Sequence, residues 1–153
     1  MKRLEIGDKA PEFDLESNTG RQKLSDYAGK WLVIYFYPKD NTPGCTTEAC
    51  DFRDALKDLD LEVLGVSPDS LKSHQNFSDK YSLPFPLLSD PDKRMATAYA
   101  AYGEKKNYGK TYLGIIRSTF IINPDGKIAL AMYNVRAKGH VERVRKKLAE
   151  LRG

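Results

Sequence analysis

The sequence predicts one α/β domain over residues 1–153, with a central mixed β-sheet flanked by helices and preceded by an N-terminal hairpin. Two observations support this fold class. In the first half of the chain, apolar runs typical of buried strands alternate with helical patterns, in the order strand–helix–strand–helix. A further helical pattern, a hairpin signal and a terminal amphipathic helix follow, so the sheet is expected to be mixed.

The N-terminal hairpin is expected over residues 13–24, where Asn18-Thr19-Gly20 supplies the turn. A short turn at residues 25–30 leads into residues 31–37, an unbroken run of apolar and aromatic side chains that is typical of a buried strand. A second such run, at residues 61–67, is expected to form the next strand.

Both cysteines lie between these two strands, in a segment with the pattern of a helix. Thr42 is expected to be its N-cap and Pro43 its first residue, because hydroxyl side chains and proline are favoured at those positions. Cys45 then lies in the first helical turn, with Cys50 five residues later. The helix should bury the apolar side chains that recur at spacings of three and four, which are Phe52, Ala55, Leu56 and Leu59.

The middle of the chain is expected to contain a helix from residue 69 or 70 to about residue 81. Its inner face has three candidates, Leu71, Phe77 and Tyr81. Residues 84–89 should be extended, since two prolines lie among them. Residues 93–102 suggest another helix, and residues 103–114, which are polar, basic and glycine-bearing, are expected to form a loop.

The last elements are a hairpin and a helix. Residues 118–122 and 127–132 flank Asn123-Pro124-Asp125-Gly126, which is a strong turn signal. The final helix is expected over residues 140–151, with one apolar face made by Val141, Val144, Leu148 and Leu151.

The position of Cys45 has chemical consequences. A helix N-terminus presents unpaired N–H groups and about half a positive charge, which favour a thiolate over a thiol. Gly44 leaves room for an approaching substrate, and Thr42 offers a hydroxyl close to the sulfur. The alternative is a pair of buried structural cysteines, but the loop ahead of Cys45 favours a nucleophile.

A family resemblance rests on the same residues. Pro38-x-x-x-Thr42-x-x-Cys45 resembles the peroxiredoxin signature, whose cysteine attacks the peroxide. Cys50 stands where the peroxiredoxin Q group, also called the bacterioferritin comigratory proteins, usually has its resolving cysteine. The resemblance covers nearly the whole chain, including residues 7–11, 67–69, 117–120 and 138–140.

This resemblance implies a thioredoxin-like fold and a thiol-dependent peroxidase that reduces hydrogen peroxide and organic hydroperoxides. Cys45 would become a sulfenic acid, Cys50 would convert it to an intramolecular disulfide, and thioredoxin or a similar dithiol protein would reduce that bond. Thr42, Arg117 and the backbone N–H of Cys45 would stabilise charge on the O–O bond. Pro38 would shield the site from water. No cofactor and no metal are required.

Arg117 stands at the entry to an apolar strand, where a charge is costly unless it has a partner or a role. Strand ends converge on the site in open α/β sheets, so Arg117 is expected near Cys45. The resemblance implies that this arginine activates the thiol and that Glu48, three residues after Cys45, orients it. The alternatives are a solvent-exposed Arg117 and a Glu48 that is favoured only by the helix dipole.

Other cysteine chemistries fit less well. A cysteine phosphatase needs an arginine six residues after the cysteine, where this chain has Asp51. A structural zinc site needs four Cys or His ligands, and the two cysteines do not have the Cys-x-x-Cys spacing of a zinc or redox motif. Gly109-Lys110-Thr111 lacks the upstream glycine of a phosphate loop. His74 and His140 are interpreted as surface or hydrogen-bonded histidines.

Composition excludes several partners. The net charge of +4 is modest and spread along the chain, so no nucleic acid is expected. No apolar run approaches the roughly 20 residues of a membrane span, and residues 1–8 lack a signal-peptide core. We therefore expect a cytoplasmic protein with no membrane partner, where a cysteine pair is more often catalytic than structural. A monomer is expected, with a weak dimer as the alternative.

Two other functions stay open at this point. One is a binding or chaperone-like protein with incidental cysteines, which peroxide-dependent loss of both thiols would exclude. The other is a general thiol–disulfide exchanger, which would reduce protein disulfides without peroxide. The sequence does not define the preferred peroxide or the physiological reductant.

Overall fold

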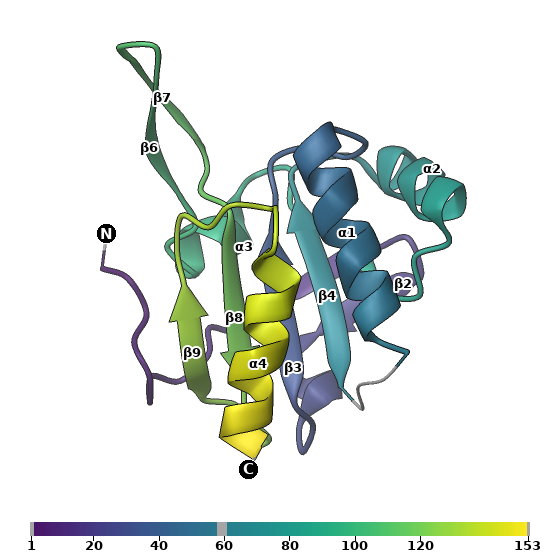
Figure 1. The fold of residues 1–153 in the computed structure, drawn as a ribbon, viewed down its shortest axis with the longest axis vertical. Coiled ribbons are helices and arrows are strands. Elements are labelled where there is room, and N and C mark those ends of the chain that lie inside the picture. The colour runs from purple at the N-terminus through teal and green to yellow at the C-terminus, as the bar shows by residue number, and fades with distance from the viewer. Residues whose placement is uncertain (1, 58–60, 153) are drawn as a thin grey trace.

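The computed structural model describes residues 2–57 and 61–152 (Figure 1). At its centre lies one seven-stranded sheet in the order β2-β1-β5-β4-β3-β8-β9. The strands are β1 (Asp14–Ser17), β2 (Gly20–Lys23), β3 (Leu32–Phe36), β4 (Glu62–Ser67), β5 (Leu87–Ser89), β8 (Ser118–Ile122) and β9 (Ile128–Met132). The pairs β3–β4 and β4–β5 are parallel and the others antiparallel, so the predicted mixed sheet with an N-terminal hairpin is confirmed.

Helices cover both faces of the sheet, as predicted. They are α1 (Pro43–Ala55), α2 (Leu71–Tyr81), α3 (Arg94–Ala98), α4 (His140–Arg152) and the 3₁₀ turn η1 (Leu24–Tyr27). In Figure 1, α1 and α4 lie side by side across the face toward the viewer. The opposite face packs against side chains of η1 and α3. None of these helices is long and apolar enough to cross a bilayer.

The central strand β3 is buried on both faces, which explains its unbroken apolar run. Val33 and Tyr35 pack on the side of α1 and α4. Leu32, Ile34 and Phe36 pack on the side of η1 and α3. Because β3 pairs with β4 on one side and β8 on the other, its carboxyl end lies in the middle of the sheet edge, where α1 begins.

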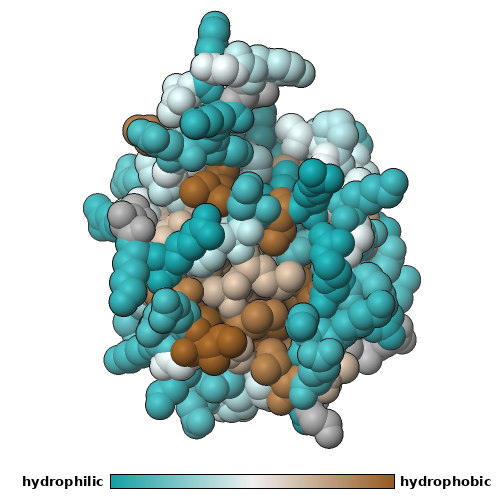
Figure 2. Space-filling model, turned by 60° about the vertical axis from the view of Figure 1, so that its left-hand side comes forward, coloured by the Kyte–Doolittle hydropathy of each residue, from teal (hydrophilic) through white to brown (hydrophobic). Residues whose placement is uncertain are grey.

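The outer edge of the sheet at β9 is partly covered by the N-terminal segment. Gly7 donates to the carbonyl of Ile128 and Ile128 donates to that of Asp8, both over 2.8 Å. Figure 2 brings this side forward and shows apolar side chains gathered over its lower middle, within a hydrophilic rim. Hydrogen bonds from the N-terminal segment therefore protect an edge strand that would otherwise be free to pair.

Residues 103–114 were expected to form a loop, and this prediction was wrong. They form a second, two-stranded sheet of β6 (Tyr102–Asn107) and β7 (Lys110–Ile115), which projects from the body of the domain (Figure 1). Tyr108 and Gly109 make its turn with φ of 53° and 78°, as tight hairpins require. Most side chains of the hairpin meet solvent on both faces, so the alternating pattern of a half-buried strand is missing.

Three helical predictions need correction. The helix expected over residues 93–102 is only five residues long, because Ala100 adopts a left-handed conformation and β6 begins at Tyr102. Leu71 is 41% exposed, and His74 and Ser78 join Phe77 on the buried face of α2 instead. Leu151 is also exposed at the end of α4. The predicted contact of Leu59 lies outside the described residues.

Candidate active site

The loop between β3 and α1 places the first functional residues. Thr42 is the N-cap of α1 and Pro43 the first helical residue, as predicted. The Thr42 carbonyl accepts the N–H of Thr46 over 2.8 Å. Its hydroxyl does not cap the helix but donates to the carbonyl of Lys39 over 2.9 Å. The side chain therefore tightens the loop ahead of the helix.

Cys45 lies in the first turn of α1 and is 1% exposed. Nη2 of Arg117 donates to its sulfur over 3.2 Å, and Nη1 of the same guanidinium donates to Oε1 of Glu48 over 2.5 Å. Arg117 reaches the helix from the residue before β8, at the same edge of the sheet. The structure thus brings together Cys45, Glu48 and Arg117, which sequence reasoning had grouped.

Burial and charge act in opposite directions on this group. Burial works against the charge of Arg117, but Glu48 and Cys45 outweigh it and raise the pKa of the guanidinium. Burial raises the pKa of Glu48 to about 7, although Arg117 opposes the shift. Glu48 Oε2 has no hydrogen-bond partner among the described residues. The carboxyl group is therefore poised between two protonation states near neutral pH.

Cys50 lies on the same helix and is partly exposed, and both cysteines are free thiols. Five residues along an α-helix advance about 7.5 Å and turn by about 140°, which separates their Cα atoms by roughly 8.6 Å. A disulfide needs Cα atoms within about 7 Å and converging Cβ vectors. The intact helix therefore keeps Cys45 and Cys50 apart.

Pro38, Gly44 and Lys105 complete the surroundings of the Cys45 loop as the structure describes them. Pro38 is half-buried where β3 leads into the loop. A Cβ atom at Gly44 would lie 3.5 Å from Nη2 of Arg117 and 3.6 Å from Cβ of Ala137, so the helix backbone passes close to the guanidinium. Lys105 on β6 was missed by sequence reasoning. Burial and the charge of Arg117 lower the pKa of Lys105, whereas Cys45 raises it. This lysine therefore lies close enough to the site to interact electrostatically with both residues.

A family model described as the AhpC/TSA family matches residues 6–131. The chain belongs to this family. Peroxiredoxin Bcp of Bacillus subtilis strain 168 is 51% identical to it over 142 residues, 90% of each chain. Peroxiredoxin Bcp of Xanthomonas campestris pv. campestris is 48% identical over 141 residues, 88% of each chain.

Solved structures agree with this assignment. A cysteine variant of peroxiredoxin Q from Xanthomonas campestris superposes with a TM-score of 0.87 at 45% identity, covering 96% of both chains. A cysteine variant of PrxQ from Xylella fastidiosa gives a TM-score of 0.90 at 39% identity over 100% of both chains. The thioredoxin-like fold and membership of the Bcp/PrxQ group are thereby confirmed, and the chain is a peroxiredoxin enzyme.

The two histidines of this peroxiredoxin are fully buried, so the surface alternative was wrong for both. Nε2 of His140 lies 2.7 Å from the hydroxyl oxygen of Thr119, and its Nδ1 has no partner among the described residues. Burial, helped by Arg143 and Arg117, lowers the pKa of His140 to about 4, so the ring is neutral at ordinary pH. His74 is hydrogen-bonded to Asp40, a residue that no sequence motif had singled out.

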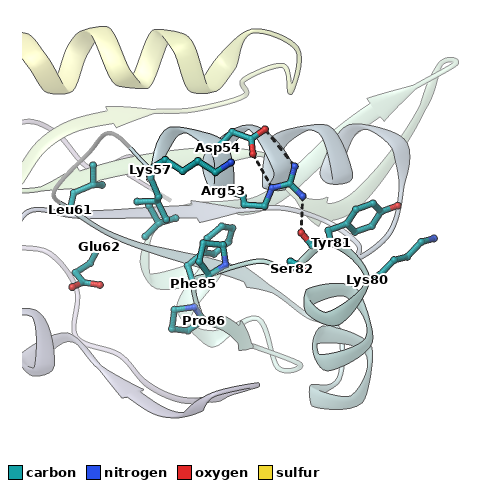
Figure 3. Close-up of a pocket in the computed structure, with 13 residues that line it drawn as sticks. Arg53, Asp54, Lys57, Leu61, Glu62, Lys80, Tyr81, Ser82, Phe85 and Pro86 are labelled. Carbon is teal, nitrogen blue, oxygen red and sulfur yellow. Dashed lines mark hydrogen bonds and ion pairs between the residues drawn. The ribbon is translucent and has the colours of Figure 1, made fainter.

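A cavity of about 730 Å³ lies between the C-terminal ends of α1 and α2, and Cys45 is not among the residues that line it (Figure 3). Arg53 crosses this space and donates from Nη1 to the carbonyl of Tyr81 over 2.7 Å, while its Nε donates to Asp54 over 3.0 Å. The Arg53 hydrogen bond thus connects the last turn of α1 to the end of α2. In the described part of the chain, no group of three His, Cys, Asp or Glu side chains is arranged to hold a metal ion.

Proposed function

We propose that Cys45 is the residue of this peroxiredoxin that attacks the hydroperoxide. The observation that carries the proposal is the hydrogen bond of 3.2 Å from Arg117 to a buried sulfur at a helix N-terminus. The Cys45 thiolate attacks the terminal peroxide oxygen, an S–O bond forms as the O–O bond breaks, and the leaving alkoxide or hydroxide takes up a proton. Cys45 is then a sulfenic acid.

Three groups stabilise the charge that moves onto the O–O bond in this step. They are the Arg117 guanidinium, the backbone N–H of Cys45 and the Thr42 hydroxyl. The Thr42 hydroxyl has a single proton, which it donates to the Lys39 carbonyl over 2.9 Å, so the hydroxyl must turn away from that carbonyl to donate to the peroxide. Glu48 holds the guanidinium in place, and Pro38 limits access of water.

Cys50 resolves the sulfenic acid. Its thiolate attacks the Cys45 sulfur, an S–S bond forms as the S–O bond breaks, and the sulfenic oxygen leaves as hydroxide, which takes up the proton released from the Cys50 thiol and becomes water. Because the intact α1 keeps the two sulfurs apart, the first turns of the helix must unwind for this step. Thioredoxin or a similar dithiol protein then reduces the disulfide by thiol exchange and restores both thiols.

Hydrogen peroxide and organic hydroperoxides are the proposed substrates. A solved structure of the bacterioferritin comigratory protein of Xanthomonas campestris is described in terms of alkyl peroxide reduction, and that chain has a TM-score of 0.86 at 44% identity to this one.

The test is peroxide consumption by the purified protein with thioredoxin and its reductase. We expect Cys45→Ser to abolish turnover. Cys50→Ser should abolish turnover with thioredoxin but still consume one equivalent of peroxide, because its Cys45 can be oxidised once. Full activity in Cys45→Ser, or a missing disulfide in the peroxide-treated wild type, would overturn the proposal.

A further inference from the structure

A buried polar cluster lies beside the Cys45 loop and has no part in the reaction as written above. At its centre is Asp40, which is 7% exposed and lies five residues before Cys45. Its Oδ1 accepts from the Tyr37 hydroxyl over 2.5 Å, and its Oδ2 accepts from the Ser73 hydroxyl over 2.8 Å. Nδ1 of His74 lies 2.6 Å from the same Oδ2.

His74 connects this carboxyl group to the sheet. The ring is 0% exposed, and its Nε2 lies 2.9 Å from the carbonyl oxygen of Leu88 in β5. A carbonyl oxygen only accepts, so Nε2 carries a proton. One further proton lies between Nδ1 and Asp40, and the pair is net neutral whichever atom holds it. A buried pair that is neutral and fully hydrogen-bonded avoids the penalty of an isolated buried charge.

The hydrogen bonds of the cluster converge on the loop rather than on α1. The backbone N–H of Asp40 donates to Oδ2 of Asp69 over 2.6 Å, and that of Tyr37 donates to the carbonyl of Val66 over 3.0 Å. The partners come from α2, β5, the end of β4 and the residues that follow it. The loop is therefore fixed from three neighbouring elements, independently of whether α1 is wound.

We propose that Asp40 and His74 are positioning residues for the attack on peroxide. They do not touch the sulfur. They hold the loop whose end, Thr42, starts α1, and thereby keep Cys45 in line with Arg117. The inference rests on the proposed role of Cys45 and its resolution by Cys50.

This arrangement predicts opposite effects on the two chemical steps. Attack on peroxide needs the aligned, wound helix, and a small misplacement of reacting groups slows such steps strongly. Formation of the disulfide needs release of the same helical turn. A loosened loop should therefore slow the attack and speed the resolution, whereas a residue with only a structural role would change the stability without this split.

The test compares single variants in two backgrounds. In Cys50→Ser protein, quenched flow with mass spectrometry measures the second-order rate at which hydrogen peroxide oxidises Cys45. In protein with both cysteines, the same method follows conversion of the sulfenic acid to the disulfide. Asp40→Asn keeps the volume of the side chain but replaces one acceptor oxygen with a donor NH2 group, so the hydroxyls of Tyr37 and Ser73, which donate to different oxygens of Asp40, cannot both keep their acceptor.

A matched pair of milder variants guards against failure to fold. Tyr37→Phe removes one hydroxyl that donates to Asp40. Tyr99→Phe removes one hydroxyl that donates to the carbonyl of Pro11, within the cluster on the opposite face of the sheet. Both tyrosines are almost fully buried, so the two substitutions delete equivalent atoms near and far from the loop.

We expect Asp40→Asn to slow oxidation of Cys45 by about tenfold or more. Tyr37→Phe should slow it by a smaller factor, and Tyr99→Phe should leave it unchanged. Disulfide formation should be as fast as in wild type or faster in both loop variants. Oxidation within about twofold of wild type in Asp40→Asn, or a parallel slowing of both steps, would overturn the inference. If wild-type Cys45 is not oxidised or no disulfide forms, the proposed function itself fails.

Discussion

Nη2 of Arg117 lies 3.2 Å from the sulfur of Cys45, although the two residues are 72 positions apart in the chain. The sheet explains this contact, because β3 and β8 are neighbours and antiparallel, so the end of one lies beside the beginning of the other. Cys45 follows β3 and Arg117 precedes β8. The same guanidinium is held by Glu48, one helical turn beyond Cys45, so a single arginine joins both ends of this small group.

Removal of the Arg117 side chain should reduce peroxidase activity strongly while the fold persists. We expect Arg117→Ala to lower kcat/KM for hydrogen peroxide by a factor on the order of a hundred or more, because it loses the donor at the developing charge. Arg117→Lys should recover only part of this, since an ammonium cannot bond Glu48 and the sulfur with two fixed nitrogens. Arg21→Ala is the control, because Arg21 is exposed and pairs with Asp14 and Glu16 on the hairpin. Activity within about threefold of wild type in Arg117→Ala would contradict the role.

Oxidation should unwind the beginning of α1. Hydrogen exchange monitored by mass spectrometry should show that residues 43–54 lose amide protection in the disulfide form, because the intact helix cannot bring the two sulfurs together. Thr46 and Thr47 between the cysteines are mediocre helix formers, which lowers the free energy of local melting. Amides of α4 and β8 serve as internal controls and should exchange equally in both redox states. Equal protection of the α1 segment, with the disulfide verified by mass, would exclude the mechanism.

Glu48 should make the fold less stable as pH rises. Its pKa is raised from 4.5 to about 7 by burial, so between these values the folded state holds a proton that the unfolded state has released. The free energy of unfolding therefore falls across this window, by up to about 1.4 kcal/mol per pH unit. Denaturant titrations of wild type and Glu48→Gln at several pH values measure the difference. If the difference in the free energy of unfolding between wild type and Glu48→Gln stays constant from pH 4.5 to 7, Glu48 does not titrate in this window.

His140 should act in the opposite direction. Burial lowers its pKa from 6.5 to about 4, so between these values the unfolded state binds a proton that the folded state does not. The stabilisation is complete above about pH 6.5 and is lost as pH falls toward about 4, again by up to about 1.4 kcal/mol per pH unit. The difference in the free energy of unfolding between wild type and His140→Asn, measured at each pH, isolates the contribution of His140. Because Glu48 and His140 oppose each other between about pH 4.5 and 6.5, wild type should show a flatter stability profile than either variant.

Periodicity and helix-start signals predicted the central sheet, the hairpins at both ends and the placement of Cys45, because these depend on burial of neighbouring residues. The β6–β7 hairpin escaped prediction since neither face of it is buried enough to impose alternation. The pair of Asp40 and His74 escaped for a different reason. These residues are 34 positions apart, and their contact depends on how α2 crosses the sheet rather than on any local pattern.

The contact between Glu48 and Arg117 was within reach of the sequence, because Glu48 shares a helix face with Cys45 and Arg117 marks a strand entry. The burial of His140 could not be predicted from the sequence, because histidines are intermediate in burial on average and no local pattern marks this one as buried. Its hydroxyl partner, Thr119, lies on β8, which only the packing of α4 against the sheet brings close.

Under the proposed mechanism, the presence of both cysteines on α1 should make the oxidised protein less stable than the reduced one. A bond between Cys45 and Cys50 closes a ring of only six residues. By lowering the conformational entropy of the unfolded chain, such a crosslink would stabilise the folded state by about 2 kcal/mol. The helix that must open for it buries Cys45, Ala49 and Phe52, and each large apolar side chain that is exposed forfeits roughly 1.5–3 kcal/mol. The proposed disulfide should therefore lower the melting temperature, whereas disulfides in secreted proteins usually raise it. Its reduction by the proposed dithiol donor would restore both thiols and let the helix form again in the same event.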